Sequence, residues 1–185
     1  MANIGLKNLL FGVLTETGGV ATYGTAYKPA KAISCSVSIT NNEAKLYADD
    51  ALAESDTSFQ SGTVSLGIDN NDLEIMALLL GHSYANNHID RKSTDLAPYV
   101  GLGRIITMMV NGSLKYKVEF LCKVKFAEPS AEENTKGESL EFGTSTIEGQ
   151  IATLASGLWS IAETFDSMAS AQSYLNSLFG GSVSL

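Results

Sequence analysis

Apolar and polar residues alternate with a period of two along several stretches of this chain, and the longest is residues 112–126. Its even-numbered positions are apolar and most of its odd-numbered positions are charged. Successive side chains of a strand point to opposite faces, so the stretch predicts a strand with one dry face and one charged face. The dry face comprises Tyr116, Val118, Phe120, Cys122, Val124 and Phe126, against Lys115, Lys117, Glu119, Leu121, Lys123 and Lys125.

Further strands are predicted, most clearly by the same alternation at residues 31–40. They span residues 8–15, 31–40, 58–69, 100–110, 139–154 and 158–162. Residues 100–110 are instead apolar on both sides, which predicts a strand that is central in a sheet or covered by another subunit. Asn111-Gly112 is a strong signal for a hairpin turn between two of them. Asn41-Asn42 also predicts a turn, from which residues 43–47 return as a partner strand.

Phe59 is out of phase with the other apolar residues of its predicted strand, Val64, Leu66 and Ile68. A bulge adds one residue to a strand and reverses the phase beyond it. Gly62 would permit such a bulge, so we expect the register to be corrected near this position.

A period near 3.6 predicts two helices, at residues 71–81 and 166–179. In the first, Asn71 is the expected cap, and the apolar stripe is Leu73, Met76, Ala77 and Leu80. In the second, Asp166 is the expected cap, and the stripe is Met168, Ala171, Leu175 and Leu178. The predicted fold is mainly β: an antiparallel β-sandwich or barrel with two short helices, a helix packed on the sheet, and one domain over 1–185.

Residues 43–58 differ from the predicted strands around them. From residue 48 onward the segment is acidic and contains few β-branched residues, so we expect a projecting loop or hairpin. Leu46, Tyr47 and Leu52 would serve there as apolar anchors to another subunit, with Asp49 and Asp50 as polar residues that set the register.

The formal net charge is -8, and no Lys or Arg follows Lys136. Binding to nucleic acid through phosphates needs clustered cations. The basic cluster in this sequence is the Lys face of residues 115–125, which Glu119 interrupts and which contains no Arg. We therefore interpret that face as a solvated or inter-subunit surface.

The sequence contains no set of residues whose types and spacing are typical of a catalytic or metal site. His82 and His88 lie six positions apart, which does not place two metal ligands on one helical face. Residues 69–80 lack the Gly and the final Glu of a calcium loop. The acidic residues 49–56 fall in an exposed loop. An acid and base pair needs surroundings that give its two carboxyl groups different pKa values, and an exposed loop does not provide them. We expect no enzyme activity, no metal and no cofactor.

Cys35 and Cys122 lie on the apolar sides of two predicted strands, where free cysteines pack as small hydrophobes. A disulfide between them is left open by the sequence. The apolar run at residues 9–14 is too short for a membrane span or a signal core, so we expect a protein made in the cytoplasm without membrane contact.

Six segments carry a family resemblance, in order along nearly the whole chain. Together they resemble the major tail proteins of long, non-contractile-tailed bacteriophages. The segments are residues 3–9 (NIGLKNL), 46–50 (LYADD), 66–69 (LGID), 123–130 (KVKFAEPS), 146–149 (TIEG) and the helix at 165–180.

The resemblance implies a tail tube protein of the virion. In that family six copies form a ring, rings stack, and the joined sheets enclose a lumen through which genomic DNA passes without specific binding. It further implies contacts with other tail proteins such as the tape measure and the tail terminator. Some members carry a C-terminal immunoglobulin-like domain, which we do not expect within residues 1–185.

An acidic conduit would repel the phosphates of DNA and let DNA slide. Glu119 and Glu148 are candidate lumen acids, although the net charge can equally serve solubility. An alternative is a monomeric β-sandwich or barrel that acts as a binding or adhesion module. Such a module would stay monomeric when concentrated and would protect its sheet edges.

Overall fold

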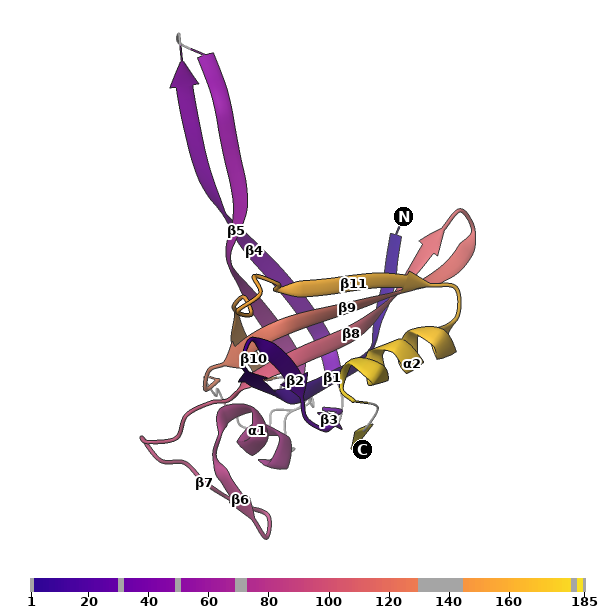
Figure 1. Ribbon diagram of the computed structural model, residues 1–185. Coiled ribbons are helices and arrows are strands. Elements are labelled where there is room, and N and C mark those ends of the chain that lie inside the picture. The colour runs from indigo at the N-terminus through magenta and orange to yellow at the C-terminus, as the bar shows by residue number, and fades with distance from the viewer. Residues whose placement is uncertain are drawn as a thin grey trace, which may run out of the picture.

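The computed structural model describes residues 2–29, 32–48, 51–68, 73–129, 145–180 and 183–184, which are mainly antiparallel β-structure with two short helices, as predicted (Figure 1). The elements are β1 (Ala2–Thr17), β2 (Val20–Tyr23), β3 (Ala26–Tyr27), β4 (Ala32–Ala48), β5 (Ala51–Ile68), α1 (Leu73–Leu80), β6 (Ser83–Ala85), β7 (His88–Asp90), β8 (Tyr99–Val110), β9 (Ser113–Phe126), β10 (Ser145–Ile151), β11 (Ser160–Phe165), α2 (Met168–Leu178) and β12 (Val183–Ser184).

One sheet contains ten of these strands. Its order is β12-β3-β1-β8-β9-β10-β5-β4, with β2 attached to β1 and β11 attached to β9. All its pairs are antiparallel except the pairing of β12 with β3, and β6 and β7 form a separate small sheet. Because β8 lies between β1 and β9, it is central, which explains why its sequence is apolar on both sides.

Two turns depend on residues that tolerate positive φ. Asn111 and Gly112, with φ of 49° and 79°, connect β8 and β9 as the sequence predicts. Asn86 and Asn87, with φ of 52° and 58°, connect β6 and β7, where the sequence predicts no strand. Positive φ at both central residues is the requirement of the tight type I′ hairpin.

A bulge in β9 overturns the prediction of a single dry face. Val100 is paired with Val124, but Leu102 is paired with Leu121, so β9 has one residue more than β8 between these pairs. An extra residue reverses which face the following side chains occupy. The charged residues beyond the bulge, Lys123 and Lys125, therefore lie on the opposite face from Lys115 and Lys117.

The bulge lets β9 contribute to two cores on opposite faces of the sheet. The α1 core contains Leu9, Phe11, Val64, Leu66, Ile75, Leu79, Leu80, Val100, Leu102, Leu121, Val124, Phe126, Ile147 and Ile151. The α2 core contains Leu10, Ala26, Ile105, Val118, Phe120, Cys122, Leu154, Ala171, Leu175 and Phe179. Since β1 and β5 share the α1 core although three strands separate them, the sheet curls until these strands face each other.

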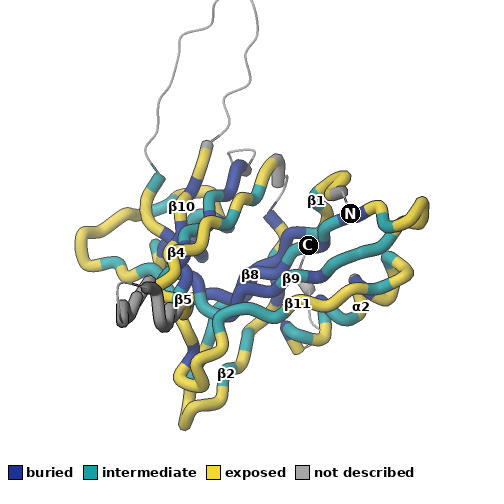
Figure 2. The backbone as a smooth tube through the Cα atoms, turned by 90° about the horizontal axis from the view of Figure 1, so that it is seen from above, coloured by how far each residue is buried: buried dark blue, intermediate teal, exposed yellow. Residues whose placement is uncertain are grey.

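Helix α2 packs on a site that glycines leave open. A Cβ at Gly103 would lie 2.3 Å from Leu175 Cδ1, and one at Gly12 would lie 2.8 Å from Phe179 Cδ1. At Gly101 it would lie 2.5 Å from the Tyr23 ring. The space left by these glycines is filled by aromatic rings and by α2. Figure 2 shows the buried residues along β8 and β9 in dark blue.

The helices begin and end close to the predicted positions. Ser167, not Asp166, caps α2, and its hydroxyl accepts a hydrogen bond from Ser170 N at 3.1 Å. The expected stripe of α2 is confirmed, because Ala171 and Leu175 are buried and Met168 and Leu178 pack beside them. In α1 the predicted stripe is partly wrong: Ile75, Ala77, Leu79 and Leu80 are the buried residues, whereas Leu73 is exposed.

We expect Gly103→Ala to destabilise the protein by about 1–3 kcal/mol, because the new methyl group would overlap Leu175 and displace α2. Urea unfolding monitored by circular dichroism measures the change. Gly5→Ala is the matched control in β1, since a Cβ there meets nothing within 4 Å. Equal stability of the Gly103→Ala variant and the wild type would contradict this packing.

Candidate functional site

Strands β4 and β5 extend beyond the body as a two-stranded arm (Figure 1). We define the arm as residues 41–59, whose backbone is paired from Asn41 and Phe59 to Ala48 and Ala51. The predicted projection is therefore a two-stranded antiparallel ladder, with a register shift between Leu46 and Tyr47. The predicted turn at Asn41-Asn42 is wrong, because both residues continue β4 and pair with Phe59 and Ser58.

The expected inter-subunit contact residues lie in the distal part of the arm. Leu46 is paired with Glu54, and Tyr47 is paired with Leu52. Asp49 and Asp50 lie outside the described residues. A two-stranded ribbon has no core of its own and is marginally stable in water. The length of this ladder thus favours contact with another molecule.

Four strands of the large sheet pair with one neighbour only among the described strands, and the two longest of them are β4 and β11. β4 pairs with β5 alone, and β11 pairs with β9 alone. An edge strand presents backbone N–H and C=O groups that can pair with a further strand. The body therefore offers two long edges at which a sheet could continue into another copy.

The outer face of β4, β5 and β10 is rich in hydroxyl groups. Three cross-strand rows place its side chains side by side, while the alternate residues point into the α1 core. This hydroxyl face consists of Ser34 and Thr146 in the first row, Ser36, Ser65 and Glu148 in the second, and Ser38, Thr63 and Gln150 in the third. It contains one carboxylate and no cation.

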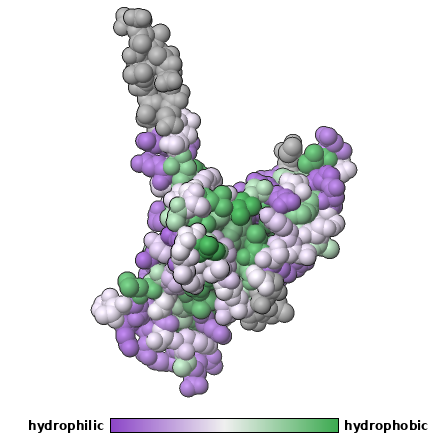
Figure 3. All heavy atoms as spheres, viewed as in Figure 1, coloured by the Kyte–Doolittle hydropathy of each residue, from purple (hydrophilic) through white to green (hydrophobic). Residues whose placement is uncertain are grey.

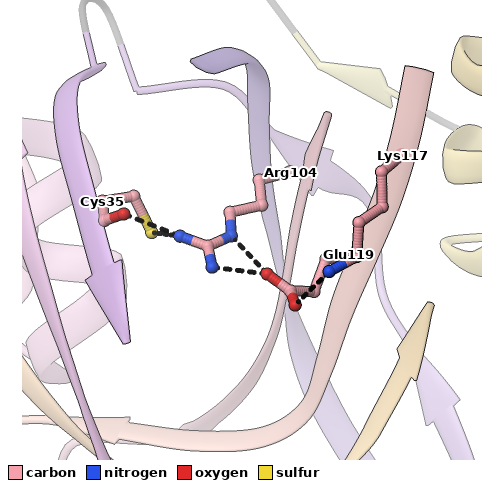
Figure 4. A network of polar contacts seen from close by, with 4 residues as sticks. All are labelled: Cys35, Arg104, Lys117 and Glu119. Carbon is pink, nitrogen blue, oxygen red and sulfur yellow. Dashed lines mark hydrogen bonds and ion pairs between the residues drawn. The ribbon is translucent and has the colours of Figure 1, made fainter. Parts of the chain in front are cut away.

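The two candidate lumen acids have different surroundings in the structure. Glu148 is exposed on the hydroxyl face, and in the part of the chain that the structure describes its carboxylate has no ion-pair partner. Glu119 lies on β9 and is held in a network with Arg104 and Lys117 (Figure 4). The charge of Glu119 is therefore compensated by neighbouring cations, whereas the exposed charge of Glu148 can interact with another molecule.

Arg104 organises this network between three strands. Its Nε donates to Glu119 Oε2 at 2.8 Å, and its Nη1 donates to the backbone carbonyl of Cys35 at 2.7 Å (Figure 4). The Arg104 and Glu119 side chains are only 12% and 18% exposed. Burial raises the pKa of Glu119, but the hydrogen bonds and charges of Arg104 and Lys117 outweigh burial and leave that pKa below its ordinary value.

A second buried cluster surrounds His82, which follows α1. Nδ1 of His82 lies 2.8 Å from Asp95 Oδ2, and Nε2 contacts Glu128 Oε1. Ionised carboxylates only accept hydrogen bonds, so the position of the ring between two of them favours the protonated imidazole, in which both nitrogens donate. The bond with Asp95 raises the pKa of His82; burial opposes this rise, and Glu128 adds to it.

The lysines of β9 are dispersed rather than gathered into a basic patch. Lys115 contacts Asp166, and Lys123 lies 2.8 Å from Glu16 Oε2. Lys123 and Lys125 also lie over the Tyr99 ring, at 4.8 and 5.4 Å from its centre. Because most of these cations have acidic partners and the bulge divides them between two faces, they provide no continuous track for phosphates.

Among the described residues, no group of three or more His, Cys, Asp or Glu side chains could hold a metal ion. None of the helices in the same part of the chain is long and apolar enough to cross a membrane. Cys35 and Cys122 are both free, so the disulfide left open by the sequence is absent. They belong to opposite faces, since Cys122 is in the α2 core and Cys35 packs against the α1 core.

Comparison of the sequence with models of known protein families gives no match, and comparison with curated proteins gives none either.

The two acids provide a matched pair of variants. We expect Glu119→Gln to lower the free energy of unfolding by about 1–3 kcal/mol at pH 7, because Arg104 loses its charged partner. Glu148→Gln should stay within about 0.5 kcal/mol of the wild type. A lowered pKa means that the contribution of Glu119 is present above its unfolded pKa and is lost as the pH falls through the folded value. Urea titrations at pH 7 and pH 3.5 measure both effects, and equal behaviour of the two variants would refute the assignment.

The cluster around His82 predicts a pH-dependent stability. Because the pKa of His82 is raised by folding, its contribution is complete below about pH 6.5 and is lost as the pH rises through the folded value. His82→Gln should cost about 1.5–3 kcal/mol at pH 5.5 and less at pH 9, measured by urea unfolding. His88→Gln is the control, since the His88 side chain is 74% exposed. A loss that is the same at both pH values for His82→Gln would contradict protonation of the imidazole.

Proposed function

We propose that this protein is a tail tube protein that assembles into stacked rings around a lumen for DNA. The observation that carries the proposal is the arm: a long β-ladder, with one register shift between Leu46 and Tyr47, extends away from both cores, and a two-stranded ribbon without a core of its own gains stability from contact with another molecule. Other copies of the chain are the partner that the resemblance implies, arranged as hexameric rings in the virion.

The free edges support closure into a ring. A copy that pairs its β4 or β11 edge with a neighbour satisfies backbone groups that water would otherwise have to satisfy. Because the two edges differ, the contact would be heterologous, and such contacts close into rings when the rotation between copies allows it. A binding module that stays monomeric, the alternative function, would leave these edges and the arm without a partner copy.

The hydroxyl face is the surface that best fits the lumen. Its hydroxyl groups, one amide and the exposed Glu148 offer no cation to a phosphate. DNA binding depends on cations that neutralise phosphates, so DNA could slide past this face without being held. On the face of the molecule that Figure 3 shows, the apolar surface gathers over the middle of the body.

No feature of the described residues requires a catalytic role. The buried polar clusters around Arg104 and His82 join elements of the fold through ion pairs, and their charges compensate one another. We therefore assign the protein a structural role rather than an enzymatic one, with the tape measure protein and the tail terminator as further partners within the tail.

Removing the arm tests the proposal. Replacing residues 43–57 by Asn-Gly would close the hairpin directly after the Asn42–Ser58 pair, with the turn dipeptide that already joins β8 and β9. We expect a folded monomer that forms no tubes, because both cores lie outside the deleted segment. Negative-stain electron microscopy and light scattering measure assembly, and circular dichroism verifies the fold.

Leu46→Asp is a second test variant. It keeps the length of the arm and places a charge at an expected contact. Its tubes should be fewer or absent. Normal tubes from the shortened protein would refute the role of the arm in assembly, and a wild-type protein that remains monomeric at millimolar concentration would refute the proposed function.

A further inference from the structure

The root of the arm contains a bulge that redirects one aromatic side chain. Thr40 is paired with Ser61, but Asn41 is paired with Phe59, so Gln60 is the extra residue of β5. Without the bulge, Gln60 would occupy the inner face. With it, Phe59 turns to the same face as the residues of the α1 core.

Phe59 uses this orientation to stack on Trp159. The two rings are nearly parallel, with an angle of 7° between their planes and 4.6 Å between their centres. Trp159 is the single tryptophan of the chain and belongs to the connection between β10 and β11. The stack therefore joins the arm to a segment from the other end of the sequence.

The backbone around Trp159 is firmly attached to the body. Its carbonyl accepts a hydrogen bond from Cys122 N at 2.9 Å, at the bulge of β9. Just before it, Leu154 N donates to Leu158 O at 2.8 Å, and Gly157 N donates to Leu154 O at 2.8 Å. The backbone of Trp159 is thus held in place by hydrogen bonds, and Phe59 packs against its ring.

On β4, the nearest contact is that of Ile39, which lies two residues before the arm and is 37% exposed. A Cβ at Gly62 would lie 2.9 Å from Ile39 Cδ1 and 3.1 Å from Ile151 Cδ1, so the two methyl groups converge over the glycine. Beyond these contacts the root becomes exposed, at Asn41, Asn42, Thr57 and Ser58.

We propose that the Phe59–Trp159 stack is a joint that sets the direction of the arm, and that both residues are positioning residues for assembly. One contact would let a two-stranded ribbon swing about its root. Two contacts, with Ile39 on β4 and Phe59 on β5, define its angle to the body. The assembly part of this inference rests on the proposed function, while the joint itself is a property of the isolated subunit.

Amide hydrogen exchange of the dilute, unassembled protein tests the joint. In Trp159→Ala we expect exchange in residues 57–61 to become faster on the order of tenfold, with the centre of β8 and β9 unchanged. Trp159→Phe keeps an aromatic platform and should remain within roughly twofold of the wild type. Leu158→Ala is the matched control, because its side chain is exposed in the same turn.

Phe59→Leu provides a milder variant in case Trp159→Ala fails to fold. Its Trp159 fluorescence should shift to longer wavelength as the ring loses its cover, while circular dichroism stays that of the wild type. Unchanged exchange at the root in folded Trp159→Ala, or unchanged emission in Phe59→Leu, would overturn the joint.

Electron microscopy of the same variants tests the positioning role. Trp159→Ala should form few or irregular tubes, and Trp159→Phe and Leu158→Ala should form normal ones. Normal tubes from folded Trp159→Ala would overturn this role. If the wild type itself forms no tubes, the proposed function fails, and the exchange measurement still decides whether the joint exists.

Discussion

Backbone polar groups must be paired when they leave water, and this requirement shapes the whole molecule. The curled sheet satisfies it internally from β1 to β5, and the longest strands left with a single partner among the described elements are β4 and β11. The arm extends the same ladder away from the two cores. A protein of this kind gains most when its edges and its arm meet other copies, and this is the physical basis of the proposed tube.

The bulge in β9 lets one strand contribute to both cores. It sends Phe120 and Cys122 to the α2 core, and Leu121 and Val124 to the α1 core. Both helices are thereby tied to one strand, and Trp159 is hydrogen-bonded to that strand at the bulge.

Alternation and turn residues were sufficient to predict the mainly β fold, both helices and the β8–β9 hairpin. They failed where long-range pairing decides the local structure. Two Asn-Asn pairs behave differently: Asn86-Asn87 forms a turn, whereas Asn41-Asn42 continues a strand, because Ser58 and Phe59 pair with it. The phase change at Phe59 did predict the bulge, which lies two residues before Gly62, at Gln60.

The candidate site was predictable in its position but not in its chemistry. The sequence predicted a projection at residues 43–58. It did not predict that the β4–β5 pairing continues through this projection, because acidic residues have low strand propensity in isolation. It also treated Glu119 and Glu148 alike. The ion pair with Arg104 depends on β8 and β9 being neighbours in register, which alternation alone does not determine.

The central claim is that identical copies complete the exposed backbone edges and enclose a hollow axis. The most direct measurement is cryo-electron microscopy of the concentrated wild-type protein. The account predicts rings or tubes in which β4 or β11 of one copy is hydrogen-bonded to a strand of the next, with the hydroxyl face toward the axis. Solitary subunits, or an assembly in which both edges remain unpaired, would contradict it.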